Sequence, residues 1–240
     1  MSNGRILYEG PSLLDGAPIV VIGIGFSAGS ANRKTGDMIQ THILRADMPP
    51  TDAIKSGADS SICGACPHRG DGTGKGRTCY VNVGQGPLAV WKTYKAGGYP
   101  LWDGTGVNGR TVRLGTYGDP AAVPVHVWHA LLRDADGWTG YTHQWETRPD
   151  LRTLCMASAD SVNDALRAQL RGWRTFRVAL PNHAPRMQGE AVCPASAEAG
   201  KKLTCVQCRA CNGAQGQRGS IVIAAHGGTA VMANIRRQAA

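Results

Sequence analysis

The sequence is poor in large aromatic residues and in long apolar runs. Of its 240 residues only two are Phe, whereas 32 are Gly. The core must therefore be mainly aliphatic with some Trp, and the chain must contain many turns. The longest apolar run, residues 17–26, is about half of the roughly 20 residues that a membrane span needs. It follows an acidic residue and contains glycines, which a signal peptide would not, so we expect a cytoplasmic protein with no membrane partner.

Acidic residues and several familiar catalytic motifs are also scarce. Asp and Glu number 17 against 26 Lys and Arg, which gives a formal net charge of +9. The sequence contains no P-loop, no His-Glu-x-x-His motif and no Ser, His and Asp in a hydrolase order. The apolar content of 42% excludes a wholly disordered chain. The charge favours an anionic partner, such as a nucleotide, DNA or RNA, although a merely soluble basic surface would give the same count.

Strand-like and helix-like patterns alternate along the chain. Strands are predicted at residues 18–25, 111–116, 138–145, 152–157, 173–180 and 220–225, with a strand or helix at 38–45. Helices are predicted at residues 123–133, 161–172 and 230–237. Alternation of this kind implies a largely parallel sheet. We predict one α/β domain over residues 1–240, built as an incomplete β/α barrel or an open parallel sheet, with residues 1–16 as a leader of no clear pattern.

The helix predicted at residues 161–172 has the clearest signals. Ser161 can cap its N-terminus, and Gly172 is placed to end it. Val162, Leu166 and Leu170 recur at helical spacing, which is typical of the apolar face of a helix.

Eight cysteines are the strongest chemical signal in the sequence. Disulfides are disfavoured in the cytosol, where clustered cysteines usually hold metal. Seven of the eight lie in two Gly-rich segments without periodicity, residues 57–86 and 193–219. We predict that both segments are metal-binding insertions in the domain. Cys155 lies instead in an apolar strand pattern and is predicted to be a small core residue.

The second segment carries Cys193 in a Cys-Pro pair, followed by Cys205, Cys208 and Cys211 at successive spacings of three. Such a thiolate set is similar to ferredoxin-like ligation of a [4Fe–4S] cluster. The order differs, because here the Cys-Pro pair precedes the triplet. A four-thiolate zinc site is the main alternative, but zinc sites usually use two separated pairs, so the crowded triplet favours iron.

The first segment carries Cys63, Cys66 and Cys79, with His68 nearby. With His68 as the fourth ligand, this set would form a closed zinc site. With the three thiolates alone, a [4Fe–4S] cluster would keep one iron free for a small ligand. Catalysis requires such an incompletely ligated metal, because a substrate or cofactor must reach it.

Polar residues follow three consecutive predicted strands. Asp119, His143 and Asp160 stand at or just after the carboxyl ends of these strands, where ligands bind in parallel α/β folds. We expect the three residues to converge on one site, with His143 as a ligand or proton-transfer group. The candidate catalytic residues are Arg113, Asp119, Tyr141 and His143, and Asp160 is a candidate for cofactor binding.

The loop after the first predicted strand has a weaker signal. Residues 23–28, Gly-Ile-Gly-Phe-Ser-Ala, resemble a dinucleotide-binding turn, but no convincing helix follows, which favours a structural turn. Residues 30–35 contain Arg33, Lys34 and Thr35, which together with backbone amides form a candidate phosphate-binding loop. An ordinary solvated loop is the alternative.

Four short motifs resemble those of a group of Cys-rich phage and plasmid-borne proteins of undefined activity. The motifs are Cys-Pro at residue 66, Cys-Tyr at residue 79, Arg-x-Gly-x-x-Gly-Asp at residues 113–119 and Gly-Tyr-Thr-His at residues 140–143. The resemblance covers roughly residues 32–213. That group is more remotely similar to radical S-adenosylmethionine enzymes, which implies a partial β/α barrel with a cluster near its mouth. The radical enzymes normally carry Cys-x3-Cys-x2-Cys, whereas two residues separate Cys63 from Cys66 here and twelve separate Cys66 from Cys79.

The cysteine patterns predict an iron–sulfur enzyme with one or two [4Fe–4S] clusters, with zinc as the alternative metal. The resemblance to the radical enzymes implies S-adenosylmethionine as a candidate cofactor. The expected substrate is a nucleotide or a base in DNA, and a phage setting fits DNA modification or nucleotide metabolism in the host cytoplasm. The alternative is a non-enzymatic, metal-stabilised protein whose Lys and Arg contact nucleic-acid phosphates. A third hypothesis is a structural phage component in which metal binding stabilises loops that lack a hydrophobic core.

Overall fold

The structure is a computed structural model that describes residues 2–30, 32–180, 186–200, 203–214 and 218–238. The predicted segment 193–219 is therefore described except for residues 201–202 and 215–217, and the ends of the predicted domain, residues 1 and 239–240, lie outside the described residues.

The strands within this part of the chain are β1 (Gly4–Pro11), β2 (Pro18–Ile24), β3 (Met38–Arg45), β4 (Thr111–Tyr117), β5 (Gly137–Thr139), β6 (Tyr141–Thr142), β7 (Met156–Ala159), β8 (Thr175–Ala179), β9 (Glu190–Val192) and β10 (Ser220–Ala224). The α-helices are α1 (Pro50–Ser56), α2 (Ser60–Cys63), α3 (Gly86–Lys95), α4 (Val125–Leu132), α5 (Val162–Leu170), α6 (Cys205–Cys208) and α7 (Thr229–Gln238). Short 3₁₀ turns are η1 (Pro67–Arg69), η2 (Pro120–Ala122), η3 (Pro149–Leu151) and η4 (Ala197–Ala199).

The strands form two open sheets of five strands each, so the fold is mixed α/β. In the first sheet the order is β1-β2-β3-β4-β5, with antiparallel pairing up to β3 and parallel pairing from β3 to β5. In the second sheet the order is β6-β7-β8-β10-β9, and all neighbours are parallel. The predicted parallel sheet is thus confirmed for most pairs. The described strands do not close into a barrel, so of the two predicted architectures the open sheet fits.

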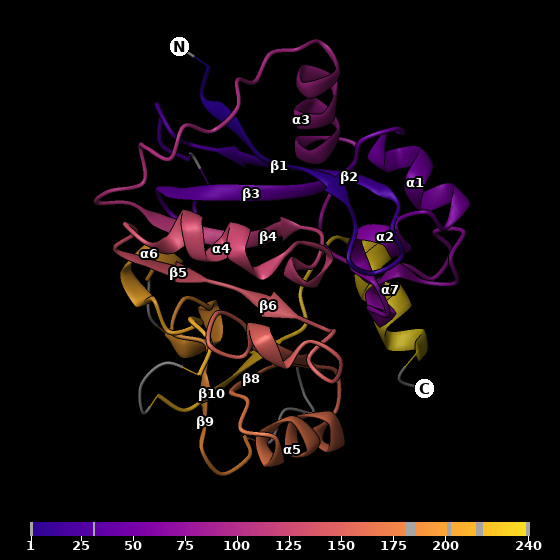
Figure 1. The fold of residues 1–240 in the computed structure, drawn as a ribbon. Coiled ribbons are helices and arrows are strands. Elements are labelled where there is room, and N and C mark those ends of the chain that lie inside the picture. The colour runs from indigo at the N-terminus through magenta and orange to yellow at the C-terminus, as the bar shows by residue number, and fades with distance from the viewer. Residues whose placement is uncertain (1, 31, 181–185, 201–202, 215–217, 239–240) are drawn as a thin grey trace.

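The two sheets meet at Gly140, which separates β5 from β6. Figure 1 shows these two strands nearly in line, between the first sheet above and the second sheet below. The Gly140 amide donates to the Cys211 carbonyl oxygen over 2.9 Å, and its own carbonyl oxygen accepts from the Met156 amide over 2.9 Å. A Cβ atom at this position would lie 2.9 Å from Cys155 Sγ and 3.1 Å from the Leu154 carbonyl oxygen. Glycine therefore allows the strand to pass from one sheet to the other close to Leu154 and Cys155.

The predicted leader at residues 1–16 is wrong in part, because residues 4–11 form β1. This strand pairs antiparallel with β2, from Gly4 opposite Ile24 to Pro11 opposite Pro18. Its residues are mostly half-buried and show no clean alternation. The strand is stabilised by pairing with the buried β2, which a local pattern cannot reveal.

Other element boundaries also differ from the prediction. The strand predicted at residues 138–145 ends at Thr142, and the strand predicted at 152–157 begins only at Met156. The preceding residues form turns instead, with the Cys155 amide donating to the Leu151 carbonyl oxygen over 2.8 Å. The short helices α1 and α3 were not predicted, because neither has the long apolar repeat that marks an amphipathic helix.

The helix α5 is confirmed, but its predicted apolar face is not buried. The Ser161 hydroxyl accepts a hydrogen bond from the Asp164 amide, as expected of an N-cap. Val162, Leu166 and Leu170 are 41%, 46% and 88% exposed, whereas the buried side chains of the helix are alanines. The helix packs on β7 and β8 through these small side chains, and the larger aliphatic residues are left on the outside.

The buried core is divided very unequally. A large cluster fills the first sheet and its helices, with fully buried members such as Ile22, Leu114 and Trp128. A small second cluster contains only Met156, Cys193, Cys211, Ile221 and Ile223 as buried members among the described residues. Two of the predicted metal-ligating cysteines thus belong to the small core of the second sheet. Cys155 is fully buried in the large cluster, which confirms its prediction as a core residue.

Every helix in the described part of the chain is too short or too polar to span a lipid bilayer.

Candidate functional site

One cavity of about 230 Å³ collects the cysteines of both segments. Its lining includes Cys63, Cys66, Cys79, Cys193, Cys205, Cys208 and Cys211. All of these cysteines are free thiols in the structure. The cavity is many times the size that one water molecule needs, so it has room for a small organic molecule beside a metal centre.

The first segment is folded around the backbone of His68. Cys63 is the last residue of α2, and its carbonyl oxygen accepts from the Cys66 amide over 3.3 Å. The amides of Thr78 and Cys79 donate to the His68 carbonyl oxygen over 3.2 and 3.1 Å. These bonds bring the last cysteine of the segment back to the first two.

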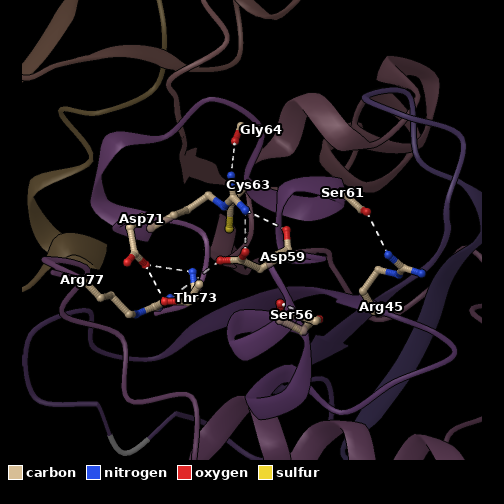
Figure 2. Close-up of polar contacts among 12 residues, drawn as sticks. Arg45, Ser56, Asp59, Ser61, Cys63, Gly64, Asp71, Thr73 and Arg77 are labelled. Atoms are coloured by element: carbon tan, nitrogen blue, oxygen red, sulfur yellow. Dashed lines mark hydrogen bonds and ion pairs between the residues drawn. The ribbon is translucent and has the colours of Figure 1, made fainter. Parts of the chain in front are cut away.

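A buried ion pair holds this segment where regular secondary structure does not. Arg69 donates to Asp59 Oδ1 over 2.6 Å and to the carbonyl oxygens of Gly57 and Gly64 over 2.8 and 3.2 Å. Figure 2 shows Asp59 beside Cys63, with Arg77 reaching the other carboxylate oxygen over 3.9 Å. Asp59 is only 1% exposed, so its charge must be compensated inside the protein.

The second segment is held by backbone bonds to distant parts of the chain. The amides of Cys205 and Val206 donate to the carbonyl oxygens of Lys34 and Thr35, each over 3.0 Å. The Cys193 amide donates to the Val222 carbonyl oxygen over 2.8 Å. The predicted loop 30–35 therefore packs against the second cysteine segment.

Arg174, which directly precedes β8, also holds the second cysteine segment. Its guanidinium donates to the carbonyl oxygens of Ala210, Gly213 and Gly219 over 2.8, 2.7 and 2.8 Å. One side chain thus satisfies several backbone acceptors of a segment that has little secondary structure.

The thiols within each segment lie close enough to affect one another's ionisation. Burial raises the pKa of Cys63 well above its usual range, and the neighbouring Cys66 and Cys79 raise it further. Burial also raises the pKa of Cys211 to about 12, with only partial compensation by a hydrogen bond from Tyr141. Several thiolates together are therefore unfavourable without a compensating positive charge, which a metal centre supplies.

A single zinc ion would bring the sulfur atoms of its cysteine ligands close together. Sulfur atoms around one tetrahedral zinc ion lie roughly 3.8 Å apart, as follows from a Zn–S bond of about 2.3 Å. Among the described residues, no three cysteine sulfurs lie within 4.8 Å of one another. The described cysteines are thus not preassembled as a single-ion site.

The predicted strand-end residues do come together. The His143 amide donates to Asp119 Oδ2 over 2.8 Å, and His143 Nε2 lies 3.3 Å from Asp160 Oδ2. Burial lowers the pKa of His143, but Asp160 and the Cys66 sulfur outweigh it, so that this pKa is raised well above its usual range. The imidazole is thus coupled both to a carboxylate and to the first cysteine set.

Asp119 has mainly a positioning role, which explains the preceding glycine. Gly118 has φ = +85°, and a Cβ there would lie 2.7 Å from Ile43 Cβ. The turn allows the Asp119 amide to bond the Ile62 carbonyl oxygen and its carboxylate to accept from Ala121 over 2.9 Å. Burial raises the pKa of Asp119. This carboxylate connects the end of β4 to the backbone of His143.

Arg113 and two tyrosines form a separate part of the cavity. Arg113 Nη2 donates to Tyr80 Oη over 2.9 Å, and its guanidinium lies 5.9 Å from the centroid of the Tyr141 ring. The Tyr141 and Phe176 rings are 4.6 Å apart. The sequence prediction missed Tyr80 and Phe176. Tyr80 adjoins Cys79 in the sequence, whereas nothing in the sequence marks Phe176.

The three side chains of the predicted phosphate loop lie in different environments. Lys34 lines the cavity, and its Nζ lies 3.0 Å from His226 Nε2. Arg33 is exposed and does not line the cavity. Thr35 is buried, and its hydroxyl accepts from Gln40 Nε2 over 2.8 Å. Of this loop, only Lys34 is placed to meet a ligand in the cavity.

Comparison with known proteins adds no relative to this picture. No protein-family model matches the chain, and searches of curated proteins and of solved structures returned no match.

Proposed function

We propose that the protein is an iron–sulfur enzyme whose two cysteine segments hold [4Fe–4S] clusters at one substrate cavity. Cys63, Cys66 and Cys79 would hold a cluster with one iron free of cysteine. Cys193, Cys205, Cys208 and Cys211 would hold a second, fully ligated cluster. The observation that carries this proposal is that all of these cysteines line the same cavity as Arg113 and His143. Purely structural metal sites are closed within their own loop and need no shared cavity.

The position of the cavity supports an enzyme. The carboxyl ends of the parallel strands β4, β6 and β7 lead to Asp119, His143 and Asp160, which line it. Active sites occupy this end of the strands in barrels and open α/β sheets alike. Binding of S-adenosylmethionine at the free iron is the finer form of the proposal. A cluster with a free iron supplies single electrons to a small molecule bound there.

The remaining residues of the cavity suit a nucleotide or a nucleobase as the substrate. Arg113 and Lys34 provide positive charge for phosphate oxygens. Tyr141 and Phe176 offer aromatic faces on which a base can stack. His143, held by Asp119 through its backbone and adjacent to Asp160, is placed to move a proton at the substrate.

Anaerobic purification tests the proposal directly. A brown protein with about eight irons and matching sulfide would support two clusters. In the reduced protein, S-adenosylmethionine should change the electron paramagnetic resonance signal of the first cluster only. The change should be lost in Cys66→Ala and kept in Cys208→Ala, provided that the second variant folds. A colourless protein with one or two zinc ions would contradict the proposal.

The net charge of +9 also supports a second candidate, a metal-stabilised nucleic-acid-binding protein. Such a protein should bind DNA or RNA with an affinity that falls steeply as salt rises, because phosphate neutralisation releases counterions. Arg113→Gln separates the two candidates. This substitution should abolish turnover in the enzyme, whereas it should weaken a multi-contact nucleic-acid complex only slightly. Failure to bind either nucleic acid at about 50 mM salt would remove this candidate.

A further inference from the structure

The same cavity contains three donor groups that do not depend on cysteine. His68, His143 and Asp160 each offer one ligand atom, and these atoms lie within 4.8 Å of one another. His68 Nε2 is 2.9 Å from Asp160 Oδ1, and His143 Nε2 is 3.3 Å from Oδ2. The two imidazole rings are 5.5 Å apart at an interplanar angle of 74°, so both face the one carboxylate without stacking.

The three residues are held by separate elements of the fold. His68 lies in the 3₁₀ turn η1, where its carbonyl oxygen accepts two backbone bonds from the end of the first cysteine segment. His143 directly follows β6, and Asp160 directly follows β7. Because β6 and β7 are neighbouring parallel strands, the sheet fixes the distance between these two residues.

Two features of the histidines point to a bound cation. His143 Nε2 is buried and has no hydrogen bond of acceptable geometry, even though the carboxylate is near. A buried nitrogen without a well-aligned hydrogen bond is costly, and coordination to a metal ion would satisfy it. His68 Nδ1 lies 2.7 Å from Thr78 Oγ1, which leaves Nε2 for the metal. Metal-bound histidines usually have such an outer hydrogen bond on the second ring nitrogen.

We propose that His68, His143 and Asp160 bind one divalent transition-metal ion in the cavity. Two imidazoles and one carboxylate are a known ligand set for Fe²⁺ and Zn²⁺, and they leave coordination positions open. Arg113 and Lys34 line the same cavity, so an anionic substrate that ligates through oxygen would occupy the open positions. This site goes beyond the proposed clusters and does not require them, and with the ion bound His143 acts as its ligand and not as the proton-transfer group.

Titration of Co²⁺ into the anaerobically purified protein tests the site. The wild type should bind one equivalent with weak visible bands and without the thiolate-to-cobalt charge-transfer absorption of a cysteine site. Loss of one of three ligands in His143→Gln or Asp160→Asn should weaken this binding by at least about 100-fold, and loss of the outer contact in Thr78→Val by roughly 10-fold to 100-fold. His126→Ala, which removes an exposed histidine on α4, should bind as the wild type does.

The outcomes separate this proposal from the iron–sulfur proposal. Equal Co²⁺ affinity in wild type, His143→Gln and Asp160→Asn would overturn the site, as would an equivalent that shows only thiolate absorption. Iron and sulfide contents of the same samples report on the clusters. A protein without iron that still loses one Co²⁺ equivalent in His143→Gln would contradict the clusters and support the site. Melting temperatures of the variants show whether each is folded. If His143→Gln does not fold, Asp160→Asn, which changes a partly exposed side chain, provides the test.

Discussion

The two cysteine segments are built differently although they face the same cavity. In the first segment, all three cysteines are partly exposed, and the large core of the first sheet lies beneath them. In the second segment, Cys193 and Cys211 are buried and make up part of the small core of the second sheet. A metal centre at the second segment would therefore stabilise the fold, whereas one at the first segment is free to react.

Each cysteine segment is held by one arginine, and the two arginines differ in their hydrogen-bond partners. Arg69 has a buried carboxylate partner, Asp59, within the first segment. Arg174 donates to backbone carbonyl oxygens and to Asn212 Oδ1 rather than to a carboxylate, and Cys211 lies close enough to raise the pKa of Arg174. Burial lowers the pKa of Arg174, and this cysteine partly offsets the effect. An anionic thiolate cluster would supply the missing counter-charge, so the second segment depends on its metal more than the first does.

Removal of one cysteine ligand from each segment should give the largest difference in stability between the two segments. We expect Cys211→Ala or Cys205→Ala to lose one metal centre and to destabilise the protein by on the order of 5 kcal/mol, because ligation contributes folding free energy. For a chain of this size, that corresponds to a melting temperature lower by roughly 15 °C. Cys66→Ala should also lose a centre but should melt within about 3 °C of the wild type. Metal analysis and thermal unfolding check both, and equal melting temperatures in all variants would remove the distinction.

Acid should destabilise the first half of the molecule through His42 on β3. Burial lowers the pKa of His42 from 6.5 to about 4. Between these values the unfolded chain binds a proton that the folded chain does not, so stability is fully present above pH 6.5 and falls as the pH drops toward 4. This group alone accounts for about 3 kcal/mol.

Denaturant unfolding at several pH values measures this contribution. In His42→Gln the dependence over the same window should be flatter by that amount. The exposed His126 provides the control, and His126→Ala should retain the wild-type slope. Identical slopes in all three proteins would show that His42 does not cause the acid sensitivity.

A smaller effect should separate the two arginines. Arg174→Lys should cost about 2 kcal/mol, because one ammonium group cannot reach three carbonyl oxygens and leaves buried acceptors unpaired. Arg69→Lys should cost about 1 kcal/mol, since a lysine can still pair with Asp59. Urea unfolding of the metal-loaded proteins measures the difference. A larger loss of unfolding free energy in Arg69→Lys than in Arg174→Lys would contradict the proposal that the second segment depends more on its arginine.

The smallest effect concerns the exposed face of α5, on the outside of the second half. Leu170 is 88% exposed, so Leu170→Ala should change the free energy of unfolding by less than about 0.5 kcal/mol. Ala168→Leu, which enlarges a fully buried side chain facing the sheet, should cost more than about 1 kcal/mol through overpacking. A cost above 1 kcal/mol for Leu170→Ala would mean that this face is covered in solution.

Local patterns predicted much of the architecture. The apolar run of β2 and the capped helix α5 follow from the sequence, as does the alternation of strands and helices. The strand β1 and the buried face of α5 do not, because both depend on what packs against them. In α5 the short side chains of Ala165 and Ala168 permit close approach to the sheet, which outweighs the spacing of the larger residues.

The candidate site was also predictable only in part. The spacing of the cysteines and the polar ends of the strands identified Asp119, His143 and the candidate ligands, because neighbouring parallel strands end at the same edge of a sheet. No sequence pattern joins the two cysteine segments to each other or pairs Asp160 with His68.

The amino-acid sequence by itself determined the strand and helix alternation, the two sets of thiols and the positive charge, because each depends on residues close together in the chain. Only the tertiary structure decided that both sets line one cavity, that Cys193 and Cys211 belong to a core and that two histidines face one carboxylate. These relations arise from contacts between distant residues. They depend on how the two sheets meet at Gly140, where the lack of a side chain leaves room for Leu154 and Cys155 and where the backbone bonds the second cysteine segment.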